Sequence, residues 1–525
     1  MKREALSLAF FPLSAKRRPM LQVLAGVLLP LVLGASLASG ADAGGLARLR
    51  ARGTLRWGGD IQGGEPYVYR DPRDSSRLVG FEVEIADGLA RRLGVRAEFV
   101  QNDWQNLIPS LERGDFDVIL NGLEVTPARR ERVAFTRPYY AFTETLVVRR
   151  NSPVQQLPEL AGARVGTLNA SLASDLLAAT PGVQVVLYEG VQEPYLDLED
   201  GRLAAVVLDN IIASRYGLTR PTLRAAASVG AGVYALAVRP DEPQLLRSLD
   251  DALAGLIHEG ELRAILTRWQ LWDQNQVQLE RIKAPDATAA PTLARSARPD
   301  ARPSQEVAAG RQAQTLQQLP LFLRAAGFTL LISALAMGLA VAGGLLLSVA
   351  GLHGGPVLRP VVRTYIEVFR GTPVLLQLYV LYYGLAPLLT LSAFTAAVVG
   401  LGLNYAAYEA ELYRAGLQAV PPGQSEAALA LGMSRALTLR RIILPQALRV
   451  AVPGIANDFI ALLKDSSLVS VITVVELTKQ MTISAVDVRG WLGPGLLCAA
   501  LYLALSYPLS RLARRLERRL SPVPA

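Results

Sequence analysis

The sequence predicts an α/β domain followed by an all-α membrane domain in a single chain. Its hydrophobic fraction of 51% and mean hydropathy of +0.27 are high for a soluble protein, whereas 19% charged residues are too many for a purely membrane-embedded one. Short β-rich runs alternate with helical stretches over residues 46–275, and long charge-free runs follow residue 319. A chain of 525 residues has room for two or three such domains.

Residues 1–45 have the layout of an export signal. Basic residues at 16–18 precede an apolar run over 21–37, and small residues that a peptidase accepts follow at 38–41. The run is short for a spanning helix, and an uncleaved N-terminal anchor is the alternative. No cysteine follows closely, so a lipid anchor is excluded. In either case we expect the next segment outside the cytoplasm.

Residues 46–275 read as strands alternating with helices. We expect strands at 54–57, 97–100, 118–120, 145–148, 164–167, 183–188, 204–208 and 234–238, and helices at 83–93, 107–113, 173–179 and 244–259. This rhythm predicts parallel sheets covered by helices. Two sheet lobes are expected, because the signal repeats before and after about residue 145.

Residues 276–318 break this pattern. The stretch 284–314 is rich in Ala, Pro, Arg, Ser and Thr and has no apolar periodicity, so we expect a linker. About 30 flexible residues reach on the order of 30 Å, enough to keep the first domain near the second. A spacer with no such tethering role is the alternative.

Residues 319–525 contain the apolar runs that we interpret as five spans. Three charge-free regions at 325–352, 371–408 (two passes, broken near 384–387) and 490–510 are long enough, and 447–477 is a fourth segment with charged interruptions. Basic residues fall on alternate connections, which places those connections in the cytoplasm if the first span enters from outside. This topology agrees with an exported N-terminal domain.

The net charge of +9 rests almost entirely on arginine. Nucleic-acid binding is one explanation of such an excess. However, the densest cluster, at 511–519, directly follows an apolar run, which is typical of membrane anchoring, so no nucleic-acid partner is expected. Two histidines and one cysteine make a His/Cys metal site improbable on composition.

No nucleotide site is expected either. A phosphate-binding P-loop needs Gly-Lys-[Ser/Thr], and none of the five lysines follows a glycine. We therefore expect no cofactor on this chain, with ATP bound by a partner subunit, and no enzymatic activity or catalytic residues of its own.

Four motifs in series resemble the first lobe of periplasmic solute-binding proteins for polar amino acids. They are Leu-Val-Gly-Phe-Glu-Val-Glu at 78–84, Asp-Trp-Gln-Asn-Leu at 103–107, Asn-Gly-Leu-Glu-Val-Thr-Pro-Ala-Arg at 121–129 and Phe-Thr-Arg-Pro-Tyr-Tyr at 135–140. The resemblance covers about residues 50–272. It implies a type II periplasmic-binding-protein fold whose lobes, about 46–143 with 233–275 and about 146–230, close over ligand. The hinge crossings would lie near 143–146 and 229–234.

The same resemblance assigns the residues that hold an amino acid. Arg129 would pair with the α-carboxylate and Asp209 with the α-ammonium, while Gly122, Leu123 and Ser171 complete the shell. The backbone N–H groups after Ser171 and its hydroxyl suit an anion. Plainer alternatives are a surface role for Arg129 and a helix N-cap role for Asp209.

Two departures from the family pattern bear on specificity. Glu124 stands where the family usually has Ser or Thr; pointing inward, as we predict, it favours a cationic ligand or a second amine, and pointing outward it is only solvated. The loop before Tyr67 lacks the usual aromatic residue. Trp104 is expected to supply the pocket wall, with packing between lobes as its alternative, and Glu65 to line the mouth. The acids favour a basic amino acid or a similar cation.

The segment 426–445 predicts two short helices joined at a glycine. Its spacing resembles the coupling loop, or EAA loop, of bacterial ABC-importer permeases, which docks on a cytoplasmic ATPase. The residues that carry this resemblance are Glu426, Ala427, Ala428, Gly432 and Pro445. The stretch Phe-Arg-Gly-Thr-Pro-Val-Leu-Leu-Gln-Leu at 369–378 resembles a signature of polar amino-acid permeases. For the segment 426–445, an amphipathic connector between spans is the alternative.

These resemblances together imply an ABC importer subunit that fuses a solute-binding protein to a permease. It would sit in the inner membrane as a multi-pass protein with its binding domain in the periplasm. Its partners would be a separate ATPase, a second copy or a similar permease, an amino-acid ligand and the lipid membrane. The main rival is a glutamate-receptor-type ligand-gated ion channel, which would need a selectivity-filter loop that the sequence lacks.

Overall fold

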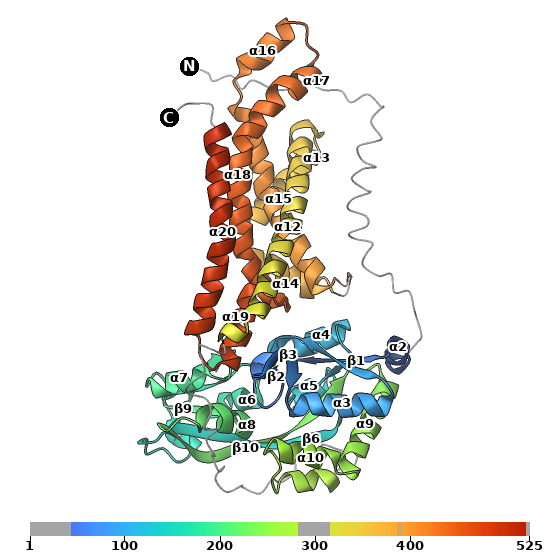
Figure 1. Cartoon of the computed structure of the whole chain (residues 1–525), viewed down its shortest axis with the longest axis vertical. Helices are drawn as coiled ribbons and strands as arrows, with labels where there is room; N and C mark the ends of the chain where they lie inside the picture. The colour runs from blue at the N-terminus through green and yellow to red at the C-terminus, as the bar shows by residue number, and fades with distance from the viewer. Residues whose placement is uncertain (1–43, 282–314, 387, 390, 521–525) are drawn as a thin grey trace. The chain divides into compact units, whose positions relative to one another are not determined.

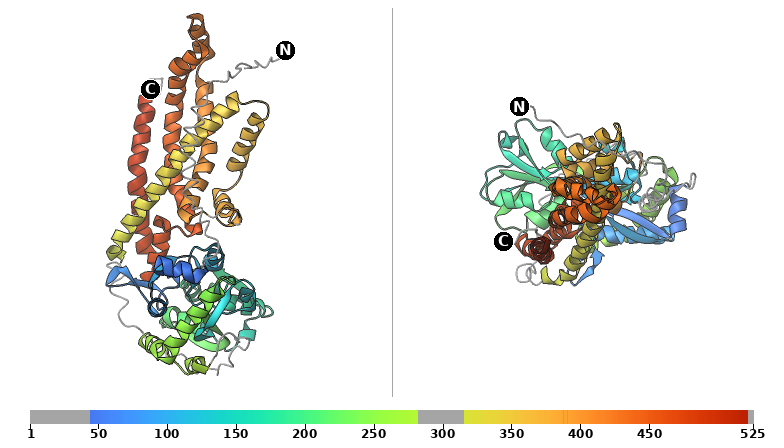
Figure 2. Two further views of the ribbon diagram at one scale, coloured as in Figure 1. Left: turned by 90° about the vertical axis from the view of Figure 1, so that its right-hand side faces the viewer. Right: turned by 90° about the horizontal axis from the view of Figure 1, so that it is seen from above.

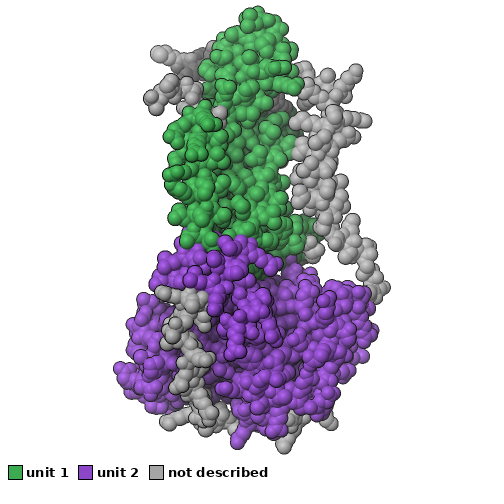
Figure 3. All heavy atoms as spheres, viewed as in Figure 1, with its two compact units in different colours: residues 1–40, 326–476, 500–525 green, residues 41–325, 477–499 purple. Residues whose placement is uncertain are grey.

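The computed structural model describes residues 44–281, 315–386, 388–389 and 391–520 (Figure 1). These residues form two compact units (Figure 3). Unit 1 holds the described residues of 326–476 and 500–525, and unit 2 those of 41–325 and 477–499. Residues 477–499, which lie within the predicted permease segment 319–525, belong to unit 2. The predicted export signal, apart from its last two residues, lies outside the described residues.

Unit 2 is built on one eight-stranded sheet, in the order β4-β1-β5-β10-β6-β9-β7-β8. Its strands are β1 (Thr54–Gly59), β4 (Arg96–Gln101), β5 (Val118–Ile119), β6 (Ala134–Arg149), β7 (Arg164–Leu168), β8 (Gln184–Tyr188), β9 (Ala205–Asp209) and β10 (Leu223–Val238). β1 runs parallel to β4 and β5, and β7 runs parallel to β8 and β9. The predicted parallel sheets are thus present as two halves, called lobe 1 (β4, β1, β5) and lobe 2 (β9, β7, β8), of one continuous sheet.

β6 and β10 join the two lobes. Each is 16 residues long, and they pair antiparallel along nearly their whole length. Most of β6 is buried on both faces, as expected for a strand in the centre of a sheet. Midway along the pair Thr143 lies opposite Ala231 and Glu144 opposite Gly230. The crossings expected near 143–146 and 229–234 fall at this point.

The helices of unit 2 include the four that were predicted, over 83–93, 107–113, 173–179 and 244–259, and others that were not predicted. They are α2 (Gly45–Arg52), α3 (Phe81–Leu93), α4 (Leu107–Arg113), α5 (Pro127–Arg130), α6 (Leu172–Ala178), α7 (Glu193–Glu199), α8 (Asn210–Ile212), α9 (Pro243–His258), α10 (Glu261–Arg268) and, from the C-terminal half of the chain, α19 (Leu477–Asp487). In α3, Phe81, Ile85 and Leu89 recur at helical spacing and are fully buried in the main hydrophobic core. The hairpin of β2 (Tyr69–Asp71) and β3 (Asp74–Val79) was not predicted.

The folded α/β region extends beyond the predicted boundary at residue 275. A 3₁₀ helix, η5, spans Gln276–Arg281. The side-chain amide of Gln276 accepts from Ala141 N at 2.9 Å and donates to Ala141 O at 2.8 Å. These two hydrogen bonds attach η5 to β6. Leu279 is buried against Ala141 and Val233. The predicted linker start at 276 is wrong by at least this turn, and 282–314 lies outside the described residues.

Unit 1 is helical. Its helices are α12 (Leu319–His353), whose first residues belong to unit 2, α13 (Leu358–Gly371), α14 (Val374–Tyr379), α15 (Ala393–Ala419), α16 (Pro422–Ala430), α17 (Arg435–Thr438), α18 (Leu444–Asp465) and most of α20 (Leu492–Leu520). α15 and α18 run side by side (Figures 1 and 2). Tyr405 on α15 donates to Asp465 Oδ2 on α18 at 2.7 Å, and Leu401 and Leu462 lie in one buried cluster.

Two helices in the described part of the chain are long and apolar enough to cross a membrane, over 319–352 and 492–519. α14 and the π-helical turn after it form a shorter apolar helix, Val374–Gly384. α15, with 27 residues, and α18, with 22, have sufficient length but carry charged or polar residues. The count of five spans therefore stays a prediction.

The coupling segment has the predicted form of two short helices with a glycine between them. α16 ends at Ala430, Gly432 has a φ of +79°, and α17 begins at Arg435. Such a φ favours glycine, because other residues lose energy in the left-handed region. Pro445 is the second residue of α18, which directly follows a π-helical turn over Leu439–Ile443.

Candidate functional site

The two lobes enclose a small cavity of ≈ 60 Å³ in unit 2. Tyr67, Trp104 and Gly122 line it from lobe 1, and Ser171 and Asp209 line it from lobe 2. These residues follow the carboxyl ends of parallel strands, where ligand sites of α/β folds form. The sequence-predicted residues that do line the cavity therefore meet from both halves of the sheet.

Arg129 spans the cleft between the lobes. Its Nη1 donates to Glu124 Oε2 at 2.6 Å and to Glu124 O at 2.8 Å, and its Nη2 donates to Ala170 O of lobe 2 at 2.7 Å. Its guanidinium carbon lies 5.2 Å from the centroid of the Trp104 ring, within range of a cation–π interaction. Thr126 caps α5 by accepting from Arg129 N at 3.3 Å, which fixes the backbone beneath this side chain. Arg129 is thus mostly enclosed at the site rather than free on the surface.

Asp209 both caps a helix and faces the cavity. Its Oδ1 accepts from Ile212 N at 2.8 Å, the N-cap bond of α8, and from Tyr67 Oη at 3.1 Å. Tyr234 Oη lies 3.2 Å from Tyr67 Oη and extends this network. Burial raises the pKa of Asp209 to about 6, although the bonds from Ile212 and Tyr67 oppose the rise. The two interpretations of Asp209 are therefore compatible, because the carboxyl group caps α8 and also lines the cavity.

Gly122 closes the floor of the cavity through its backbone. Its φ is +58°, and an added Cβ would lie 3.0 Å from the Tyr67 ring, so a side chain here is both strained and crowded. Its N–H donates to Glu82 Oε1 at 2.6 Å and to Tyr139 Oη at 3.0 Å. Tyr139 also donates to Glu82 Oε1 at 2.6 Å. Burial raises the pKa of Glu82 to about 7.

Ser171 serves mainly as the N-cap of α6. Its hydroxyl accepts from Ser174 N at 3.1 Å and donates to Leu168 O at 2.8 Å, so the expectation that this hydroxyl binds an anion needs correction. The backbone N–H groups at the start of α6 were expected to bind a ligand anion. In this structure Leu172 N donates instead to Glu124 Oε1, at 3.1 Å. The local helix start therefore binds Glu124.

Three of the expected residues are not part of the cavity lining: Arg129, which bonds to Glu124 at its edge, Leu123 and Glu65. Leu123 packs in a separate hydrophobic cluster with Leu107 and Phe116, since neighbouring residues of an extended chain point to opposite sides and Gly122 and Glu124 face the cleft. Glu65 pairs with Arg489 at 2.9 Å and with Arg215 at 3.4 Å, away from the cleft lining. Trp104, in contrast, lines the cavity as expected.

Several cavity residues were missed from the sequence. Acidic side chains dominate the lining, and it contains no Lys, Arg or His: its acids are Asp60, Glu124, Glu144, Glu189 and Asp209. Glu144 and Tyr234 stand on the predicted hinge crossings, and this position was the only indication in the sequence that they could lie near the ligand. Glu124 points inward, as predicted. The lining is thus suited to a ligand that carries positive charge.

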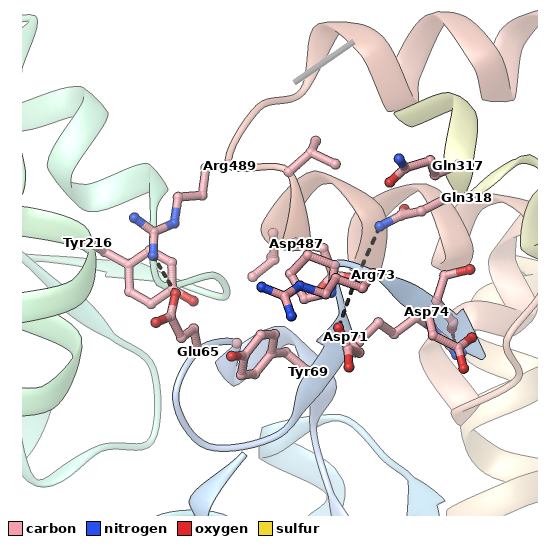
Figure 4. Close-up of a pocket in the computed structure, with 16 residues that line it drawn as sticks. Glu65, Tyr69, Asp71, Arg73, Asp74, Tyr216, Gln317, Gln318, Asp487 and Arg489 are labelled. Carbon is pink, nitrogen blue, oxygen red and sulfur yellow. Dashed lines mark hydrogen bonds and ion pairs between the residues drawn. The ribbon is translucent and has the colours of Figure 1, made fainter. Parts of the chain in front are cut away.

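A second, larger cavity of ≈ 390 Å³ lies elsewhere in unit 2 (Figure 4). The β2–β3 hairpin, Tyr216 and the end of α19 line it. Arg489 pairs with Glu65 and lies 5.1 Å from the Tyr216 ring centroid, and Gln318 Nε2 donates to Asp487 Oδ2 at 3.4 Å. Gln192 of lobe 2 also donates to Val486 O at 3.0 Å. These contacts bind residues 486–489 to the α/β fold, and the smaller cavity remains the candidate ligand site.

Two family models match consecutive parts of the chain. Residues 56–271 match bacterial extracellular solute-binding proteins, family 3, and residues 335–522 match the binding-protein-dependent transport system inner membrane component. Among the described residues there is no group of three or more His, Cys, Asp or Glu arranged to hold a metal ion.

Individual relatives resemble one part or the other. The probable amino-acid permease protein YxeN of Bacillus subtilis is 40% identical over 210 residues, which are 39% of this chain and 94% of the relative. The glutamine transport system permease protein GlnP of Escherichia coli is 41% identical over 209 residues, 38% of this chain and 94% of the relative. ABC transporter arginine-binding protein 1 of Escherichia coli is 29% identical over 203 residues, 37% of this chain and 83% of the relative. A solved structure of holo ArgBP from T. maritima aligns with 29% identity and a TM-score of 0.38 over 42% of this chain and 98% of that chain.

Proposed function

The chain belongs to the family of binding-protein-dependent transport system inner membrane components and carries a family 3 solute-binding domain in the same polypeptide; from this premise we propose that it captures a basic amino acid outside the cell and imports it with energy from a separate ATPase. It is a transporter permease of the inner membrane with its binding domain outside, and the family does not support the ion-channel alternative.

One observation carries the ligand assignment. The cavity between the lobes is lined by five acids, with Arg129 bonded at its edge. An α-amino acid needs an acid for its ammonium and an arginine for its carboxylate, and surplus acids favour a further positive charge. Similar permeases and binding proteins are named for amino acids, glutamine and arginine, which supports this class of ligand.

The coupling segment supports a partner ATPase. Leucines on and between its two short helices are exposed in unit 1, with Leu431 83% exposed and Leu429 and Leu437 near 40%. Apolar side chains at such exposure favour an interaction surface. Since no Gly-Lys pair occurs in the sequence, the nucleotide would be bound by another subunit. A permease pathway needs two membrane halves, so a homodimer or a pair with a similar chain completes the proposed assembly.

Calorimetry of the full chain in lipid nanodiscs tests the ligand assignment. The panel is the twenty amino acids and a set of polyamines. We expect saturable binding of one or more basic amino acids. Binding of none of the amino acids would contradict the proposal.

A deletion of residues 426–432 tests the coupling. Ligand binding should be retained, while the ATPase that co-purifies with the wild-type chain should be lost. Retention of the ATPase by the deletion variant would contradict the assigned role of this segment.

A further inference from the structure

Glu124 occupies the place that a ligand carboxylate would use. Its Oε2 accepts from Arg129 Nη1 at 2.6 Å, and its Oε1 accepts from Leu172 N at the start of α6 at 3.1 Å. A guanidinium and a backbone N–H at a helix start are the donors that bind free carboxylates in proteins. An incoming α-carboxylate that uses Arg129 Nη1 and Leu172 N must therefore displace Glu124.

Displacement leaves Glu124 in unfavourable surroundings. The residue is 6% exposed, and the other acids of the cavity lie around it. A buried carboxylate that loses its partner is strongly destabilising, since neither water nor a counter-charge replaces the lost bond. A ligand with only an α-carboxylate and an α-ammonium brings no cation for it, because the ammonium is matched by Asp209.

Glu144 is a second buried carboxyl group in the cavity, and one of its oxygens lacks a partner. It lies in the middle of β6, is 1% exposed and lines the same cavity, and its Oε2 has no hydrogen-bond partner. Burial raises the pKa of Glu144 well above its usual value, and Glu124 and Asp209 raise it further. A buried polar atom without a partner is rare in proteins, and Glu144 Oε2 can accept a hydrogen bond from a donor on a ligand.

We propose that Glu124 and Glu144 together form the site for a second positive charge on the ligand. The ligand carboxylate replaces Glu124 on Arg129, and the released Glu124 joins Glu144 in binding the side-chain cation. The ligand class is then amino acids with an ammonium or guanidinium side chain. Neutral amino acids are rejected because they leave the displaced Glu124 unpaired and supply no partner for Glu144. This inference rests on the proposed capture of amino acids and names the residues that set its specificity.

The test compares four ligands on the full chain in nanodiscs by calorimetry: arginine, lysine, glutamine and agmatine, which is arginine without its carboxylate. We expect arginine or lysine to bind about 100-fold more tightly than glutamine, because glutamine leaves buried carboxylates unpaired. Arginine should exceed agmatine by about 10-fold or more, since only arginine supplies a carboxylate to Arg129.

Substitutions at Glu144 and Glu124, with a control at Glu112, assign the effect to these residues. Glu144→Gln keeps the shape and should lower the affinity for basic amino acids about 10-fold or more while leaving glutamine binding unchanged or stronger. Glu124→Ser, with Glu124→Gln as the isosteric check on folding, should strengthen glutamine binding and weaken lysine binding. Glu112→Gln is the matched control, because Glu112 is exposed and pairs with Arg132 at 2.8 Å outside the cavity.

Three results would overturn this inference alone: equal binding of glutamine and arginine by the wild type, equal loss of all amino acids in Glu124→Ser, or agmatine binding as tightly as arginine. The last result would mean that Glu124 stays on Arg129 and that the ligand needs no carboxylate. Absence of binding for every amino acid would instead contradict the proposed function itself.

Discussion

Arg129 Nη1 lies 2.6 Å from Glu124 Oε2, while Nη2 of the same guanidinium donates across the cleft to Ala170 O at 2.7 Å. This arrangement ties lobe 1 to lobe 2 through the residue expected to hold the ligand. The arginine is therefore both a ligand-binding candidate and a bridge between the lobes.

Arg129→Lys should weaken ligand binding by about 10- to 100-fold, because an ammonium cannot reproduce two parallel hydrogen bonds to a carboxylate. Calorimetry with the best-bound amino acid measures the change. Arg132→Lys is the control, since Arg132 makes a similar two-bond pair with Glu112 on the surface. Equal losses in both variants would argue against a ligand role for Arg129.

Asp209 offers a way to separate capping from ligand binding. Asn caps helices as well as Asp does, whereas Ala costs about 1 kcal/mol at such a position. Asp209→Asn should therefore keep the thermal stability of the chain close to wild type and still reduce affinity about 100-fold, as the ammonium loses its counter-charge. Asp209→Ala should lose both. Wild-type affinity in Asp209→Asn would show that this residue only caps α8.

Glu82 predicts a pH dependence of stability. Its pKa is raised from 4.5 to about 7 by burial, so the folded state holds a proton that the unfolded state releases. Stability should fall as the pH rises from about 4.5 to about 7 and then remain low with respect to this group. Glu82→Gln keeps an acceptor oxygen for Gly122 N and Tyr139 Oη, and it removes the titrating group and therefore this pH dependence.

We expect Glu82→Gln to be more stable than wild type at pH 8, by up to about 3 kcal/mol, and equal to it at pH 4.5. Unfolding followed by tryptophan fluorescence at several pH values measures this, with Glu112→Gln as the exposed control. The same pH dependence in wild type and Glu82→Gln would contradict the assignment.

Gly432 and Gly423 form a matched pair in the coupling segment. An added Cβ meets no atom within 4 Å at either position, but only Gly432 has a positive φ, of +79°. Gly432→Ala should cost about 1–2 kcal/mol locally and reduce ATPase co-purification, with ligand affinity unchanged. Gly423→Ala, within α16, should leave both the ATPase co-purification and the ligand affinity unchanged. ATPase recruitment by Gly432→Ala at the wild-type level would count against a need for this turn.

Much of the α/β fold could be predicted from local patterns. The alternation of apolar strands and helices gave α3, α4, α6 and α9 within two residues of their observed ends. The hairpin β2–β3 was missed because its residues are largely polar and partly exposed, so they carry no alternating apolar signal. Continuity of the two lobes through β6 and β10 depends on long-range pairing, which a local pattern does not encode.

The candidate site was predicted in part, for a similar reason. Arg129, Asp209 and Trp104 follow from motif positions. In contrast, the pairing of Glu124 with Arg129 and Leu172 depends on how the lobes close. Glu144 stands in an apolar strand, and its place on the predicted hinge crossing does not by itself show that its side chain faces the cavity. Leu123 was wrongly assigned to the site. Its position in the motif suggested ligand binding, but its side chain points to the opposite side of the chain from those of its neighbours and packs in the core.

Uptake of radiolabelled arginine and lysine into proteoliposomes distinguishes an ATP-driven importer from a channel. The vesicles contain the full chain with the ATPase that co-purifies from its host. We expect uptake that requires ATP and the ATPase and that is abolished by deletion of residues 426–432. Uptake of equal rate without ATP, or a ligand-gated ion current in the absence of the ATPase, would contradict it.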